Sequence, residues 1–152
     1  MAQKVTLKQI NDFIASEPIA LAGASRNEKK FGYAVLKELK QKGLKVIPVN
    51  PNAVEILGEK AYPSVKSLPP EVKSLIILTK SNQTASVVKE AKEKGITRIW
   101  IQQSSDSKEA LAELEGSGIE YITGQCILMY YKPHSVHKFH GFLKKVFGSF
   151  PK

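Results

Sequence analysis

Five short apolar runs alternate along the chain with longer segments in which apolar residues recur every three or four positions. Short runs of this kind predict buried strands, and the longer periodicity predicts amphipathic helices. Because the strands are apolar throughout, both faces of their sheet must be covered, which is typical of a parallel sheet between layers of helices. The predicted strands span residues 19–22, 46–49, 75–78, 99–101 and 119–122.

Residues typical of helix ends separate these runs. Gly43, Gly95 and Gly118 each stand just before a predicted strand, where glycine takes the left-handed conformation that ends a helix. Thr6 and Gln9 form the pattern of a capping box and predict an amino-terminal helix. Since strand–helix–strand connections are right-handed, the pattern predicts a single doubly wound α/β domain over residues 1–152, with an expected strand order of 3-2-1-4-5.

The composition fits one globular domain. The chain has 152 residues, of which 42% are hydrophobic and 24% charged, and its single cysteine cannot form an internal disulfide. A lone cysteine and an amino terminus without an apolar signal segment predict a cytoplasmic protein.

The net charge of +9 favours anionic partners, but only Arg26 and Arg98 are arginines. Because nucleic-acid readers concentrate arginine, we expect a lysine-coated surface that suits a polyanionic small molecule and no nucleic acid.

The turn after the first predicted strand is the strongest candidate for a binding site. In a doubly wound sheet, ligands bind beyond the carboxyl ends of the strands, and this turn runs there from Gly23 to Gly32. Its backbone N–H groups and the following helix dipole suit a phosphate. Ser25 adds a hydroxyl, Arg26 a planar cation, and the amides of residues 24–27 further donors. The turn has neither the GxGxxG spacing of dinucleotide enzymes nor the GK[ST] ending of a P-loop.

Later loops at the same edge narrow the ligand class. Nicotinamide enzymes carry an acidic residue at the end of the second strand, where this chain has Asn50 and Pro51, so NAD and NADP are disfavoured. Gln102 and Cys126 follow the fourth and fifth predicted strands and are expected at this edge. Cys126 is either a reactive thiol that faces the ligand or a small buried apolar residue, which is the commoner role.

Several sequence strings together resemble one family. In order and in combination, over residues 14–130, they resemble the CoA-binding domain family, small Rossmann-like proteins similar to the amino-terminal domain of the succinyl-CoA synthetase alpha subunit. The strings are Ala22-Gly23-Ala24-Ser25, Gly32-Tyr33-Ala34-Val35, Lys45-Val46-Ile47-Pro48-Val49-Asn50-Pro51, Glu55-Ile56-Leu57-Gly58, Ala61-Tyr62-Pro63-Ser64-Val65, Ile99-Trp100-Ile101-Gln102 and Gln125-Cys126-Ile127.

The resemblance implies a Rossmann-like fold that holds coenzyme A. The strongly anionic 3′-phosphate and pyrophosphate of CoA would be complemented by basic loop residues. We therefore expect a small non-catalytic protein that binds CoA or acyl-CoA. The positions that match the family are Gly23, Ala24, Ser25, Arg26 and Asn27 in the phosphate loop, Asn50 and Pro51 in the second loop, and Thr79, Lys80 and Ser81 along the nucleotide portion.

The chain also departs from the family's pattern. Ser74 stands where an aspartate is common, residues 103–106 lack the usual glycine, and Ala53 stands where the synthetase has a lysine that reaches the nucleotide. The synthetase's phosphohistidine segment has no counterpart, so ligase chemistry is not expected, and no other set of side chains indicates a catalytic centre. Two alternatives stay open: a redox or other enzyme that uses a different nucleotide with Cys126 as its thiol, and a basic interaction module that has lost its ligand.

Residues 133–152 predict a basic amphipathic helix. Its apolar side chains fall on one arc, so we expect it to dock on the sheet or to form a homodimer, with a membrane surface as the alternative. His134, His137 and His140 lie here without the acid or second cysteine that would complete a zinc site, and no metal is expected.

Overall fold

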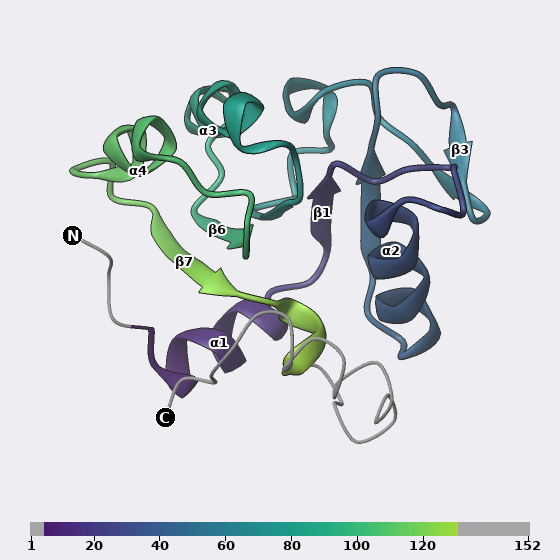
Figure 1. Cartoon of the computed structure of the whole chain (residues 1–152), viewed down its shortest axis with the longest axis horizontal. Helices are drawn as coiled ribbons and strands as arrows, with labels where there is room; N and C mark the ends of the chain where they lie inside the picture. The colour runs from purple at the N-terminus through teal and green to yellow at the C-terminus, as the bar shows by residue number, and fades with distance from the viewer. Residues whose placement is uncertain (1–4, 131–152) are drawn as a thin grey trace.

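A parallel sheet forms the centre of the molecule (Figure 1). The computed structural model describes residues 5–130. The predicted doubly wound α/β fold is confirmed, as is the amino-terminal helix α1 (Leu7–Ile14), whereas the predicted helix at 133–152 lies outside the described residues. The five strands of the sheet are β1 (Ile19–Ala22), β2 (Val46–Val49), β5 (Ser74–Ile77), β6 (Arg98–Gln102) and β7 (Glu120–Gln125).

The strand order differs from the expected one. The sheet runs β2-β1-β5-β6-β7, which is 2-1-3-4-5 in chain order, so the expected order of 3-2-1-4-5 is wrong. Both orders obey the right-handed crossover rule, and the apolar pattern does not specify on which side of β1 the third strand pairs. Here β5 pairs with β1 directly, from Ile19 opposite Ser74 to Ala22 opposite Ile77. The point where the strand order reverses therefore lies between β1 and β5.

The connection from β2 to β5 contains several short elements. It forms the two-stranded hairpin of β3 (Glu55–Ile56) and β4 (Glu59–Lys60), followed by the short helix η1 (Val65–Ser67). Tyr62 extends the edge of the main sheet through a parallel bridge to Val49. Val65 and Leu68 then join the core that lies under α3 (Ser81–Lys94). This connection between β2 and β5 thereby brings the chain from one side of β1 to the other.

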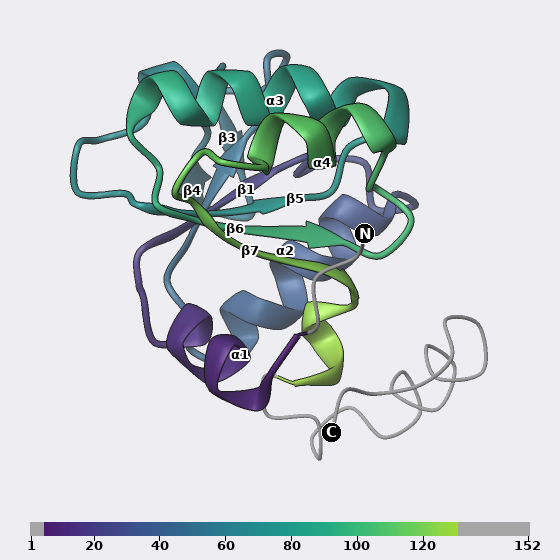
Figure 2. The same ribbon diagram turned by 90° about the vertical axis from the view of Figure 1, so that its left-hand side faces the viewer.

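Helices cover both faces of the sheet (Figure 2). One face carries α1, α2 (Phe31–Gln41) and η2 (Ile127–Met129), and the other carries η1, α3 and α4 (Lys108–Leu114). Successive strand residues point to opposite faces, so each strand contributes to both cores. Leu21, Ile76 and Trp100 belong to the first core, and Leu75, Ile77 and Ile99 to the second.

Two of the predicted glycine caps stand at helix ends, Gly43 after α2 and Gly95 after α3, whereas α4 ends at Leu114 and Gly118 lies in the turn that follows it. Gly95 follows the last residue of α3 with a φ of +87°, and Gly43 and Gly118 have φ values of +88° and +82°. These three turns return the chain to the amino ends of β6, β2 and β7, so all five strands point their carboxyl ends to the same edge.

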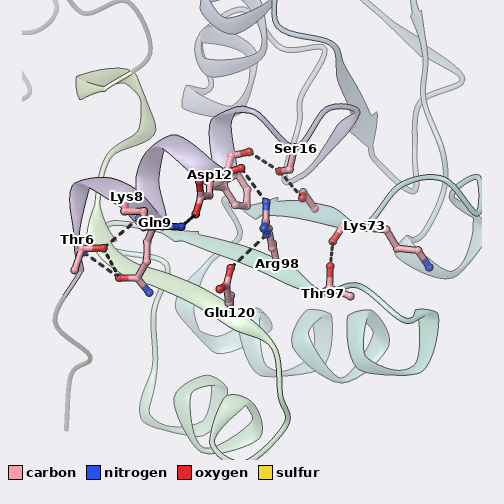
Figure 3. Close-up of polar contacts among 11 residues, drawn as sticks. Thr6, Lys8, Gln9, Asp12, Ser16, Lys73, Thr97, Arg98 and Glu120 are labelled. Atoms are coloured by element: carbon pink, nitrogen blue, oxygen red, sulfur yellow. Dashed lines mark hydrogen bonds and ion pairs between the residues drawn. The ribbon is translucent and has the colours of Figure 1, made fainter.

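Polar contacts hold α1 at the amino end of the sheet (Figure 3). Arg98 at the start of β6 donates from Nη1 to the backbone oxygen of Asp12 at 2.9 Å, and its Nε lies 3.3 Å from a carboxylate oxygen of Glu120. At the carboxyl end of the helix, the hydroxyls of Ser16 and Ser74 lie 2.6 Å apart. These contacts lie at the edge of the sheet opposite the carboxyl ends of the strands.

Replacing Arg98 by methionine tests this attachment. Arg98→Met keeps an aliphatic side chain but removes the charged donor to α1, so we expect the free energy of unfolding to fall by about 1–2 kcal/mol. Urea unfolding followed by the fluorescence of Trp100, the single tryptophan, measures the change. Lys8→Met serves as the control, because the Lys8–Asp12 ion pair is exposed and its loss should leave the unfolding midpoint unchanged. Equal midpoints for Arg98→Met and the wild type would contradict the assigned role.

Candidate functional site

Two glycines bring the turn after β1 into close backbone contact with its neighbours. Gly23 has a φ of +99°, and a Cβ atom at this position would lie 2.3 Å from the backbone oxygen of Leu78. A Cβ atom at Gly32, in the first turn of α2, would lie 2.0 Å from the backbone oxygen of Gly23. Side chains cannot occupy either space, so the turn requires glycine at both positions.

A cleft opens beside this turn at the carboxyl edge of the sheet. It has a volume of about 610 Å³, within the range of small-molecule sites. It lies where the loops after β1 and β5 diverge to opposite faces, which is the expected ligand position in a doubly wound sheet. The lining residues are Gly23, Ser25, Lys30, Phe31, Gly32, Leu78, Thr79, Lys80, Gln103, Ser104 and Ser105.

The electrostatic character of the cleft is positive. The helices α2 and α3 lie on opposite sides of β1 (Figure 1), and both begin at the cleft, with Lys30 and Lys80 as their N-cap residues. Neither lysine caps its helix through its side chain, and no carboxylate is among the described lining residues. Helix amino termini and ammonium groups both favour an anion, so the cleft suits a ligand with phosphate groups.

Hydrogen bonds between residues close in the sequence fix the conformation of the loop 23–30. The hydroxyl of Ser25 accepts from the backbone N–H of Asn27 at 3.0 Å, and Asn27 Oδ1 accepts from that of Lys29 at 2.9 Å. From the next loop, Asn50 Nδ2 donates to the backbone oxygen of Ala24 at 2.9 Å. Asn50 therefore links the loops after β2 and β1.

The structure brings only part of the predicted site residues together. Five of them line the cleft: Gly23, Ser25, Gly32, Thr79 and Lys80. Ala24 and Asn50 are outside the lining, and the hydrogen bond between them holds the loop in place. Ligand contacts at the remaining positions stay predictions: the exposed residues Arg26, Asn27, Pro51 and Ser81 lie outside the lining, and Gln102 and Cys126 are buried.

Gln102 and Cys126 form a contact inside the core. Gln102 is 1% exposed and donates from Nε2 to the sulfur of Cys126 at 2.7 Å, while its Oε1 accepts from the backbone N–H of Ile127 at 3.1 Å. Burial raises the pKa of the Cys126 thiol, so the thiolate is disfavoured. These side chains join the ends of β6 and β7, and neither of them is among the residues that line the cleft.

Sequence reasoning missed several lining residues. Lys30 and Phe31 line the cleft, and their position immediately before Gly32 at the start of a predicted helix is a signal that could have indicated them. Ser104 and Ser105 stood out only as a departure from the family, yet both line the cleft. Ser104 adopts a left-handed φ of +77°, which is the conformation that the glycine usual in this loop would favour.

Fold and site together define the class as a doubly wound α/β protein with a cleft at its switch point, where two helices begin. Within that class, the chain belongs to the CoA binding domain family, which matches residues 17–132. The described residues contain no group of three histidine, cysteine, aspartate or glutamate side chains that could hold a metal ion. Among residues 5–130, no helix has the length and apolar character needed to cross a membrane.

Relatives of the chain include large enzymes and short proteins. It is 38% identical over 106 residues to acetate–CoA ligase [ADP-forming] II of Archaeoglobus fulgidus, covering 68% of this chain but only 16% of the ligase. It is 31% identical over 112 residues to the uncharacterized protein YneT of Bacillus subtilis, covering 74% of this chain and 83% of that protein. A solved structure of a conserved hypothetical protein from Pyrococcus furiosus is 44% identical with a TM-score of 0.70, covering 72% of this chain and 95% of that one.

Gly32→Ala tests the close contact beside the cleft. Inside a helix this substitution normally raises stability by about 1 kcal/mol, because alanine is the better helix former. Here the added methyl group would collide with the backbone of Gly23, so we expect the free energy of unfolding to fall by about 1–3 kcal/mol. Urea unfolding gives the sign directly, and a gain in stability would contradict the contact.

The thiol of Cys126 gives a second test. Because it is 2% exposed and its pKa is raised, we expect a thiol reagent at neutral pH to leave the folded protein unmodified over the time in which it fully modifies the unfolded protein. The reagent is one that releases a coloured group when it reacts with a thiol, and the absorbance of that group measures the modification. Since the chain has one cysteine, the signal reports on Cys126 alone. Rapid stoichiometric labelling of the folded protein would instead support the reactive-thiol alternative.

Proposed function

We propose that this chain is a small coenzyme A or acyl-CoA binding protein without a catalytic centre of its own. In this proposal the cleft beside the turn after β1 holds the phosphates of CoA. The observation that carries it is the convergence of two helix amino termini, with Lys30 and Lys80 as their N-cap residues, on one cleft without a described carboxylate.

Membership of the CoA binding domain family supports the choice of CoA over other phosphate ligands. The ligase of Archaeoglobus fulgidus is named for acetate and CoA, but the matched part is only 16% of its length, so we do not extend ligation to this chain. The match to 83% of YneT supports a role for the domain in short chains as well. The free cysteine, Cys126, further supports a location in the cytoplasm, where the environment is reducing.

The alternative role of Cys126 as a redox thiol finds little support in the structure. The sulfur is buried and accepts a hydrogen bond from Gln102, whereas reactive cysteines are partly exposed and lie beside cationic groups. An interaction module without a ligand is the remaining alternative, and a binding measurement separates it from the proposal.

Titration calorimetry and thermal unfolding with CoA, acetyl-CoA, ATP and NAD test the proposal. We expect CoA and acetyl-CoA to bind and to raise the melting temperature, since a ligand at a hundredfold excess over its Kd stabilises the folded state by about 2.7 kcal/mol. NAD should have no comparable effect. Absence of CoA binding would contradict the proposal and favour the interaction module.

Lysine substitutions test the location of the site. Lys30→Ala and Lys80→Ala should each weaken CoA binding by about tenfold or more, because each removes a charged donor to phosphate. Lys45→Ala and Lys73→Ala are matched controls, since both lysines are exposed and precede β2 and β5 at the opposite edge of the sheet. Equal losses in the two pairs of variants would show that overall charge, rather than this cleft, attracts the ligand.

A further inference from the structure

A buried hydroxyl connects two walls of the cleft. Thr84, the fourth residue of α3, has no exposed surface. Its Oγ1 lies 2.5 Å from the backbone oxygen of Ser105, 2.8 Å from the hydroxyl oxygen of Thr79 and 3.2 Å from the backbone oxygen of Lys80. Thr79 and Lys80 belong to the loop after β5 and Ser105 to the loop after β6, so one side chain holds both loops.

The directions of these hydrogen bonds follow from counting protons. A threonine hydroxyl has one proton to donate and two lone pairs that accept, whereas a backbone carbonyl only accepts. Two oxygen atoms 2.5 Å apart need a proton between them, so Thr84 donates to Ser105. Its proton is then committed, and the 2.8 Å contact with Thr79 requires Thr79 to be the donor.

The consequence concerns the cleft, because Thr79 lines it. Once its proton is directed to Thr84, the hydroxyl of Thr79 can only accept hydrogen bonds from other partners. Phosphate oxygens of bound CoA are themselves acceptors at neutral pH, so they are poor partners for this oxygen. Hydroxyl, amide N–H and amino groups are suitable ones.

We propose that Thr79 accepts a hydrogen bond from an uncharged donor group of the bound ligand, and that Thr84 is the positioning residue that fixes this direction. The inference rests on the proposed binding of CoA and adds what kind of ligand group meets this wall. CoA offers such donors in two places: the amides and hydroxyl of its pantetheine arm, and the ribose hydroxyl and adenine amino group of its nucleotide half.

Affinity measurements on four variants test the inference. Titration calorimetry is carried out with CoA and with its nucleotide half, adenosine 3′-phosphate 5′-diphosphate. Thr79→Val and Thr84→Val should each weaken CoA binding by roughly three- to tenfold, the range for one hydrogen bond. Thr84→Ser keeps the hydroxyl and should restore wild-type affinity. Because Thr84 acts through Thr79, the double variant with valine at both positions should bind no more weakly than Thr79→Val alone.

The two ligands locate the donor. A loss by Thr79→Val for CoA but not for the nucleotide half assigns the donor to the pantetheine arm, and equal losses assign it to the nucleotide half. Thr97→Val is the matched control, because Thr97 is an exposed threonine at the opposite end of the sheet, where its hydroxyl lies 3.4 Å from the backbone oxygen of Lys73 (Figure 3). Thermal unfolding of each variant confirms that it is folded at the temperature of the titration.

Three results would overturn the inference. Unchanged CoA affinity in Thr79→Val would show that Thr79 does not contact the ligand. Wild-type or tighter binding by Thr84→Val, alongside weaker binding by Thr79→Val, would show that Thr79 donates its proton to phosphate. Additive losses in the double variant would assign Thr84 a general structural role. If the wild type itself binds neither CoA nor its nucleotide half, the proposed function fails and this inference fails with it.

Discussion

Close backbone packing at the carboxyl end of β1 sets the geometry of the whole site. The backbone N–H of Leu78 donates to the oxygen of Ala22 at 2.8 Å, so β1 and β5 stay paired up to the point where their loops separate. Gly23 then passes against Leu78 on one side, and Gly32 against Gly23 on the other, without space for a Cβ atom at either glycine. This contact determines where α2 begins relative to β5. It thereby places the first turns of α2 and α3 on either side of one cleft, which neither helix could form alone.

The parts of the fold that local chemistry decides could be predicted from the sequence. A capping box at Thr6 and a left-handed glycine at Gly95 each act within a few residues, and both are present. The strand order depends instead on where the long connection between β2 and β5 packs, and here it buries Val65 and Leu68 in the core beside α3. Crossover handedness and apolar periodicity are equally satisfied by either order, so the sequence pattern could not decide between them.

The same distinction applies to the site. Gly23, Ser25 and Gly32 were predictable because a strand, a turn and a helix start follow one another without interruption. Gln102 was expected at the cleft because it ends a strand, but its amide turns inward, where Cys126 and the backbone of Ile127 satisfy it. Which way a residue at a strand end points depends on partners from other strands, and those partners are not visible in a local pattern.

In the proposed CoA site, the cleft combines two kinds of hydrogen-bonding wall, which the overall charge of +9 does not describe. Lys30 and Lys80 offer charged donors, which suit phosphate. Thr79 offers only lone pairs, because its hydroxyl donates its hydrogen bond to Thr84. A simple polyphosphate would satisfy the lysines but would leave the threonine oxygen without a donor if it covered that wall. An unsatisfied polar group removed from water costs about 1–3 kcal/mol. A ligand that is anionic at one part and carries neutral donors at another avoids that cost, and CoA has this character. Selectivity on this basis requires only that the hydroxyl of Thr79 keeps donating to Thr84 and therefore accepts from the ligand.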